Sequence, residues 1–108
     1  MKALAHTLVA AGMALATGTA AVAQSVSGDP VAGERLAREV CAVCHLVDRG
    51  EHGISLEGAP AFQDIAADSA MTSLALRVFF RSPHEEMPNL VLSDTETDDV
   101  IAYILSLK

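Results

Sequence analysis

Two cysteines and a histidine lie close together in the run Cys41-Ala42-Val43-Cys44-His45. The pattern C-x-x-C-H is typical of covalent haem attachment. Two thiols at this spacing can each form a thioether with one of the two vinyl groups of a single haem, and the next residue then places an imidazole at the iron. The run therefore predicts one haem c, held by Cys41 and Cys44, with His45 as an iron ligand.

A second iron ligand is expected from the methionines that follow this motif. Met87 lies in the run Pro83-His84-Glu85-Glu86-Met87-Pro88-Asn89, which is expected to be a loop between two helices. Pro88 restricts the backbone next to the sulfur, and a rigid loop suits a ligand that must stay over an iron. Met87 is thus the predicted ligand, and Met71 is expected to pack in a helix. His84 is expected to brace the loop or face solvent and is the alternative ligand, whereas His52 is expected to be exposed.

Other uses of the two cysteines remain as alternatives. They could form a disulfide in an oxidising compartment, or a redox-active C-x-x-C pair. A thioredoxin-like pair requires alternating strands and helices, and no strand pattern is present. A structural zinc site requires four ligands. Beyond the motif, the mature chain contains only two further histidines, His52 and His84. Haem is the favoured interpretation.

Residues 1–23 have the features of a cleaved signal peptide. Lys2 supplies a positive start, an apolar stretch of small residues follows, and Ala21-Val22-Ala23 is an A-x-A cleavage site that would leave Gln24 first. An uncleaved membrane anchor is the alternative, but several Thr and Gly residues make the segment weakly hydrophobic for a span. We expect export to the periplasm, with no membrane span in the mature chain.

The mature chain is small and strongly acidic. The whole sequence carries 7 basic and 14 acidic residues, and cleavage removes only Lys2 from this balance. Such a charge argues against nucleic acid as a partner. It favours redox partners with a basic docking surface, although acidity can also serve solubility alone. With no Trp and few other aromatic residues, so short a chain needs a further component in its centre, and a buried haem would be one.

The periodicity predicts an all-α domain over residues 29–108, preceded by a polar leader at 24–28. Asp29-Pro30 is expected to open a first helix that runs into Cys41, with Asp29 as N-cap. A Gly-rich loop is expected over 46–60, then a short turn of helix over 61–67. A middle helix is expected from a cap at Asp68 or Ser69 to about Arg81. Ser93-Asp94-Thr95-Glu96 forms a capping box for the last helix.

Four segments of the chain resemble the class I bacterial cytochromes c. They are Gly33 with the C-x-x-C-H run, Gly58-Ala59-Pro60-Ala61-Phe62, Met87-Pro88-Asn89, and Val100-Ile101-Ala102-Tyr103-Ile104. They occur in the family's order and cover essentially all of 29–108. The resemblance implies three main helices around one haem, with the first and last helices crossing at Gly33. Two departures stand out: many members have an aromatic residue where this chain has Ala37, and the Trp that often contacts a haem propionate is absent.

The resemblance also implies roles for individual residues. Cys41 and Cys44 would carry the thioethers, His45 and Met87 would be the axial ligands, and the carbonyl of Pro60 would accept a hydrogen bond from His45. The expected activity is one-electron transfer between redox proteins, such as a dehydrogenase, an oxidase or a cytochrome complex, without catalysis. The alternative is a haem subunit of a larger periplasmic oxidoreductase. A ligand sensor or an enzyme with a displaceable Met87 is a weaker alternative.

Overall fold

The computed structural model describes residues 26–83 and 86–108, so the predicted signal peptide at 1–23 lies outside the described residues. The described chain is helical, and its one pairing of extended backbone is an isolated antiparallel bridge between Ile54 and Pro60. The helices are α1 (Pro30–Val40), the short 3-10 turn η1 (Cys41–Val43), α2 (Phe62–Ala67), α3 (Ser73–Arg81) and α4 (Asp94–Ser106). The predicted all-α class is confirmed.

The first and last helices begin where the sequence predicted. Asp29 is the N-cap of α1, its side chain accepts the Val31 amide, and Pro30 occupies the first helical position. Ser93 opens α4 with a complete capping box, in which its hydroxyl accepts the Glu96 amide and the Glu96 carboxylate accepts the Ser93 amide. Each helix start is thus encoded within a few residues.

The predicted start of the middle helix is wrong. Asp68 follows the end of α2 and its carboxylate accepts the Ala70 amide in a local turn, so the chain does not enter a helix there. Thr72 is the actual N-cap of α3, with its hydroxyl accepting the Ala75 amide. Leu76 is buried and Phe80 packs against the core, whereas Leu74 and Val78 are exposed.

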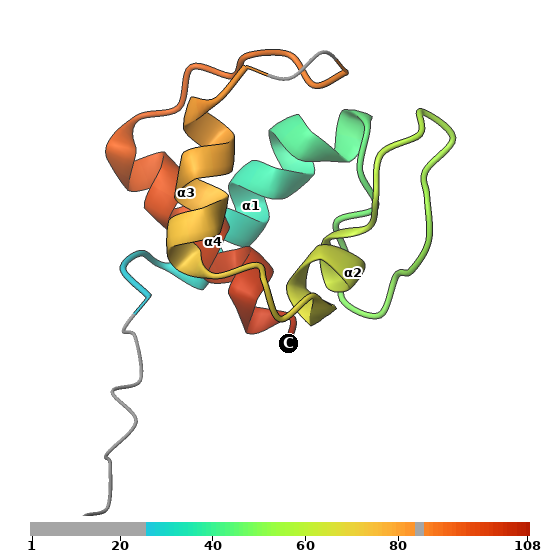
Figure 1. The fold of residues 1–108 in the computed structure, drawn as a ribbon, viewed down its shortest axis with the longest axis horizontal. Coiled ribbons are helices and arrows are strands. Elements are labelled where there is room, and N and C mark those ends of the chain that lie inside the picture. Colours follow the sequence, from blue (N-terminus) through green and yellow to red (C-terminus); the bar gives the residue numbers. More distant parts are fainter. Residues whose placement is uncertain (1–25, 84–85) are drawn as a thin grey trace, which may run out of the picture.

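The crossing of α1 and α4 forms the structural centre of the molecule (Figure 1). A Cβ atom on Gly33 would overlap the carbonyl of Asp99 and lie 2.9 Å from the Cβ of Tyr103, so only glycine permits this approach. Ala37 and Val100 are completely buried, and Ile101, Ile104 and Leu107 are almost so. The small residue at 37 thus belongs to a tightly packed helix pair.

Helices α2 and α3 flank this pair, and two loops extend beyond it (Figure 1). Phe62 and Ala66 bury α2 in the core, and the Gln63 side chain donates a hydrogen bond to the carbonyl of Leu107, near the C-terminus. Salt bridges from Arg77 to Asp98 and from Arg81 to Asp94 join α3 to α4. The loop over 46–61 and the segment over 86–92 remain outside the helix pair and approach the same cavity.

Candidate haem site

A cavity of about 620 Å³ lies between the end of α1, the two loops, α2 and α3. This volume is in the range of cofactor and ligand pockets. Its lining is mainly apolar and includes the two cysteines, His45 and Met87; the lining residues are Val40, Cys41, Val43, Cys44, His45, Glu57, Gly58, Ala59, Pro60, Phe62, Ile65, Phe79, Phe80, Glu86, Met87, Pro88 and Leu90. The structure therefore brings the four residues predicted to hold haem to one cavity.

The two cysteines reach this cavity because α1 tightens into η1 at Cys41. The amides of Cys44 and His45 both donate to the carbonyl of Cys41, at 3.0 and 2.9 Å, which folds the motif into a compact turn. Both thiols are free, the Cys41 thiol buried and the Cys44 thiol half-buried. Burial raises the pKa of the Cys41 thiol to about 11, so this thiol is uncharged at neutral pH.

The His45 ring is held from two sides. Its Nδ1 lies 2.7 Å from the carbonyl oxygen of Pro60, at hydrogen-bonding distance. The Phe62 ring packs against the imidazole, with the ring centroids 5.2 Å apart and the planes inclined at 56°. A Nδ1–H that donates to Pro60 leaves Nε2 as the basic nitrogen, which is the arrangement of a metal-binding histidine.

The two methionines considered as a second ligand lie in different places. Met87 lines the cavity and is half-buried there. Met71 packs against the core instead, which confirms its predicted packing role, although it precedes the Thr72 N-cap and is not in a helix. His84, the alternative ligand, lies outside the described residues. Of the described methionines, Met87 is thus the one in position to meet a group held by the motif.

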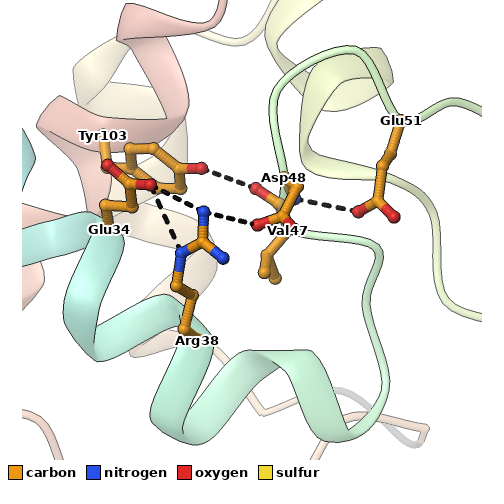
Figure 2. A network of polar contacts seen from close by, with 6 residues as sticks. All are labelled: Glu34, Arg38, Val47, Asp48, Glu51 and Tyr103. Carbon is orange, nitrogen blue, oxygen red and sulfur yellow. Dashed lines mark hydrogen bonds and ion pairs between the residues drawn. The ribbon is translucent and has the colours of Figure 1, made fainter.

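A polar network fixes the chain just after His45 to the helix pair (Figure 2). The buried Tyr103 hydroxyl donates to the carbonyl of Val47 at 2.7 Å. Arg38, on α1, bridges Glu34 at 2.8 Å and Asp48 at 3.0 Å. Burial raises the pKa of Tyr103, and the nearby Glu34 and Asp48 add to this effect, so the phenol remains a neutral donor. These contacts connect the motif to both α1 and α4.

Sequence patterns did not single out the groups that shape the loop over 46–61. The Ser55 hydroxyl donates to the carbonyl of Cys44, inside the motif. His52 is exposed as predicted, but it pairs with the carboxylate of Asp64. Such contacts join residues more than ten positions apart, and no periodicity or local motif marks them.

The cavity fits a haem. Its walls combine apolar side chains with two free thiols, an imidazole and a thioether, which are the groups that a c-type haem uses. Within residues 26–83 and 86–108, no group of three or more His, Cys, Asp and Glu side chains is arranged to hold a metal ion. Cys41 and Cys44 are not joined by a disulfide in the structure.

Charge is unevenly distributed around the cavity. The charged side chains among its described lining residues are carboxylates, those of Glu57 and Glu86. Most cationic side chains form contacts away from the cavity. Arg38, Arg77 and Arg81 pair with Asp48, Asp98 and Asp94, respectively, and Arg49 and Lys108 donate to backbone carbonyls. In the part of the chain that the structure describes, no helix has the length and apolarity needed to cross a membrane.

Comparisons with known proteins agree with this site. The family model for cytochrome c matches residues 30–108. Cytochrome c-552 of Bradyrhizobium diazoefficiens is 36% identical over 84 residues, which are 78% of this chain and 80% of that protein. No solved structure matches the chain significantly. The chain therefore belongs to the cytochrome c family of covalent haem c proteins, which carry electrons rather than catalyse reactions.

Proposed function

We propose that the protein is a periplasmic one-electron carrier whose haem is attached through Cys41 and Cys44 and ligated by His45 and Met87. The observation that carries the proposal is the single cavity that both thiols, the imidazole and the thioether line. The bound haem supplies the redox chemistry, and the chain supplies attachment, ligands and an apolar surround. Export is supported by the signal-peptide features of residues 1–23 and by the need of this attachment for an extracytoplasmic compartment.

The residues around the cavity would act on the reduction potential of a bound haem in opposite directions. A Met thioether is a neutral, soft ligand that favours the reduced iron, and apolar walls disfavour the extra positive charge of the oxidised iron. The Pro60 carbonyl, at 2.7 Å from Nδ1, makes the His45 imidazole more basic and favours the oxidised iron. With both His45 and Met87 bound, the iron would have no open coordination position for a substrate, which suits electron transfer.

The charge distribution supports a redox partner with a basic docking surface. Glu57 and Glu86 line the cavity, whereas five of the cationic side chains are paired elsewhere within the chain. Opposite fields orient two proteins before contact and accelerate their encounter. A dehydrogenase, an oxidase or a cytochrome complex with a basic face fits this description.

A second candidate is a haem subunit of a larger periplasmic oxidoreductase. It is favoured by exposed apolar side chains at or next to the cavity lining; Val43 is 71% exposed, Leu56 102% and Val91 99%. Such side chains provide contact area for a permanent partner. Isolation at native expression separates the two candidates, since a free carrier elutes as a monomer and a subunit co-purifies with its enzyme in fixed ratio.

Optical spectroscopy of the exported protein tests the proposed ligation. The oxidised wild type is expected to show the weak sulfur–iron band at long wavelength, and the reduced wild type is expected to bind CO poorly. Met87→Ala should lose this band and bind CO rapidly. Met71→Ala, which removes a thioether from the core, is the matched control and should retain both wild-type properties.

Three outcomes would contradict the proposal. Loss of the band in Met71→Ala rather than in Met87→Ala would indicate that Met71, not Met87, binds the iron. A haem protein without the band, or rapid CO binding by the wild type, would favour His84 or an open site. An exported protein without covalent haem would instead favour a disulfide or a metal site at Cys41 and Cys44.

A further inference from the structure

The Pro60 carbonyl is presented to His45 by a small hairpin in the loop over 46–61. Ile54 and Pro60 pair as an antiparallel bridge. The Ala61 amide donates to the Gly53 carbonyl at 2.9 Å, and the Ser55 amide donates to the Ala59 carbonyl at 2.9 Å. The position of Pro60 therefore depends on the start of α2, whose N-cap is Ala61, and on where the opposite side of the hairpin, Gly53 to Ser55, is held.

Asp64 holds that opposite side with both oxygens of one carboxylate. Its Oδ1 lies 2.5 Å from Nδ1 of His52, and its Oδ2 accepts the Gly53 amide at 2.6 Å. Gly53 has a φ of +97°, a backbone conformation that residues other than glycine rarely adopt. A glycine is therefore required where the chain turns its amide toward Asp64. The two donors lower the pKa of Asp64, so the carboxylate is charged at neutral pH.

The helix that carries Asp64 is itself anchored beside His45. Phe62 and Ala66 bury one side of α2 in the core. The Phe62 amide donates to the carbonyl of Leu46, the residue after His45, at 2.9 Å. Asp64 therefore projects from an element that is fixed relative to the histidine, and it can transmit that position to the hairpin.

We propose that Asp64 is a positioning residue for His45, acting through the hairpin that presents the Pro60 carbonyl to the imidazole. The path consists of contacts between neighbours: Asp64 to Gly53, Gly53 to Ala61 beside the Ile54–Pro60 bridge, and Pro60 to His45. The inference rests on the proposed ligation of iron by His45. It assigns a role in ligand positioning to an exposed pair that looks like an ordinary surface salt bridge.

The consequence concerns the hydrogen bond at Nδ1 of His45. With the hairpin held, the Pro60 carbonyl stays within reach and the imidazole keeps one tautomer and one orientation. With Asp64 removed, the Gly53 side of the hairpin loses two of its contacts, and the Pro60 carbonyl gains freedom to leave Nδ1. The His45 Nδ1 proton should then exchange with solvent more often, since exchange requires this bond to open.

The test uses the intact haem-containing protein in its reduced state. Exchange of the His45 Nδ1 proton is measured by NMR in the wild type, Asp64→Ala, Asp64→Asn and His52→Ala. We expect Asp64→Ala to accelerate exchange roughly tenfold, as for loss of a hydrogen bond. Asp64→Asn keeps an acceptor for the Gly53 amide and should show a smaller effect. His52→Ala keeps the Gly53 contact and should also show a smaller effect.

A matched control separates positioning from charge. Glu57→Gln also removes one negative charge, at an exposed residue of the hairpin tip whose side chain takes no part in the contacts from Asp64 to His45. Both Asp64→Ala and Glu57→Gln should raise the reduction potential, because each removes a negative charge that favours the oxidised iron. Accelerated exchange of the His45 proton should occur in Asp64→Ala alone.

The outcomes separate this inference from the proposed function. Unchanged exchange in Asp64→Ala, or equal acceleration in Glu57→Gln, would overturn the positioning role while His45 remains an iron ligand. Absence of the haem-shifted His45 ring resonances in the wild type would instead overturn the ligation, and the inference would fall with it. Wild-type circular dichroism and covalent haem content in each variant show that the fold is retained.

Discussion

Tyr103 illustrates how a single residue couples the helix pair to the site. Its side chain comes from α4 and is 4% exposed, and its hydroxyl satisfies the Val47 carbonyl, two residues after His45. Its ring also lies beside Phe62, with centroids 6.4 Å apart, and Phe62 in turn contacts His45. One phenol thus supports both the backbone and the ring behind the proposed iron ligand.

Removal of the Tyr103 hydroxyl is expected to destabilise the protein. Tyr103→Phe leaves the Val47 carbonyl without its donor, at a cost of about 1–3 kcal/mol for a buried group. Denaturant unfolding of the haem-containing protein measures this change. Ser82→Ala removes an exposed hydroxyl that donates to the Val78 carbonyl and is the control, with an expected change within about 0.5 kcal/mol. Equal effects of the two substitutions would show that burial at Tyr103 is unimportant.

At the scale of elements, the close approach of α1 and α4 determines where the motif lies. The motif follows α1 directly, and the Arg38 and Tyr103 contacts place the next segment against both helices. Small residues at 33 and 37 make this approach possible. A change in the distance or angle between α1 and α4 would therefore displace Cys41, Cys44 and His45 together.

Gly33→Ala tests the crossing, because two effects predict opposite signs. Helix propensity alone would make alanine more stable by up to about 1 kcal/mol. The added Cβ atom would overlap the Asp99 carbonyl, which is backbone and cannot rotate away, so we expect a net loss of about 1–3 kcal/mol. Thermal and denaturant unfolding measure the sign. A stabilised Gly33→Ala variant would show that α1 and α4 are not in close contact at this residue.

The capping box of α4 predicts a pH dependence of stability. The Ser93 amide and hydroxyl both donate to Glu96 and lower the pKa of its carboxyl group. The folded-state pKa is thus below the unfolded value of about 4.3, so the stabilisation is fully present above that pH and is lost as pH falls through the folded pKa. Glu96→Ala should destabilise the protein at neutral pH and progressively less in acid.

Unfolding curves of wild type and Glu96→Ala across the acidic range check this expectation. Ser93→Ala should cost about 1 kcal/mol at neutral pH, since it removes the N-cap hydroxyl. Asp94→Ala is a control in the same turn, because Asp94 pairs with Arg81 and takes no part in the box. A constant difference between wild type and Glu96→Ala at every pH would contradict the proposed charge state of Glu96.

At the scale of the whole molecule, the cavity takes the place of part of a hydrophobic core. The helix pair buries one cluster of side chains, whereas Val43, Phe79, Phe80 and Ile65 line the cavity. So small a chain has little apolar surface to bury without a cofactor. The haem of this family is therefore a structural component as well as the redox centre.

The charge of the whole molecule predicts how electron transfer responds to salt. With 14 acidic and 7 basic residues in the sequence, encounter with a basic partner should be fast at low ionic strength and slow as salt increases. Stopped-flow electron transfer to a basic redox protein measures this slope. Glu57→Lys and Glu86→Lys should weaken the salt dependence, and Asp68→Lys, outside the cavity lining, is the control. An equal change in all three variants would indicate that net charge alone governs the encounter.

Features that depend on neighbouring residues can be predicted from the sequence. The C-x-x-C-H run, the Asp29-Pro30 start of α1 and the Ser93–Glu96 box of α4 are each encoded within a few positions, because caps and motif turns form from adjacent groups. The family resemblance extended this to the Pro60 and Met87 loops. The predicted start of the middle helix is wrong because the Asp68 carboxylate closes a local turn with Ala70, and the Thr72 hydroxyl caps α3 instead.

Contacts between groups that are distant in the chain could not be predicted and became apparent only in the fold. The pairing of Asp64 with His52 and Gly53, the Tyr103 contact with Val47, and the convergence of η1 with the 86–90 segment on one cavity join residues far apart in the chain. These contacts follow from how the helices cross, and the crossing depends on packing at Gly33 and Ala37 rather than on local propensity. The candidate ligands were thus readable from sequence, whereas the groups that orient them required the fold.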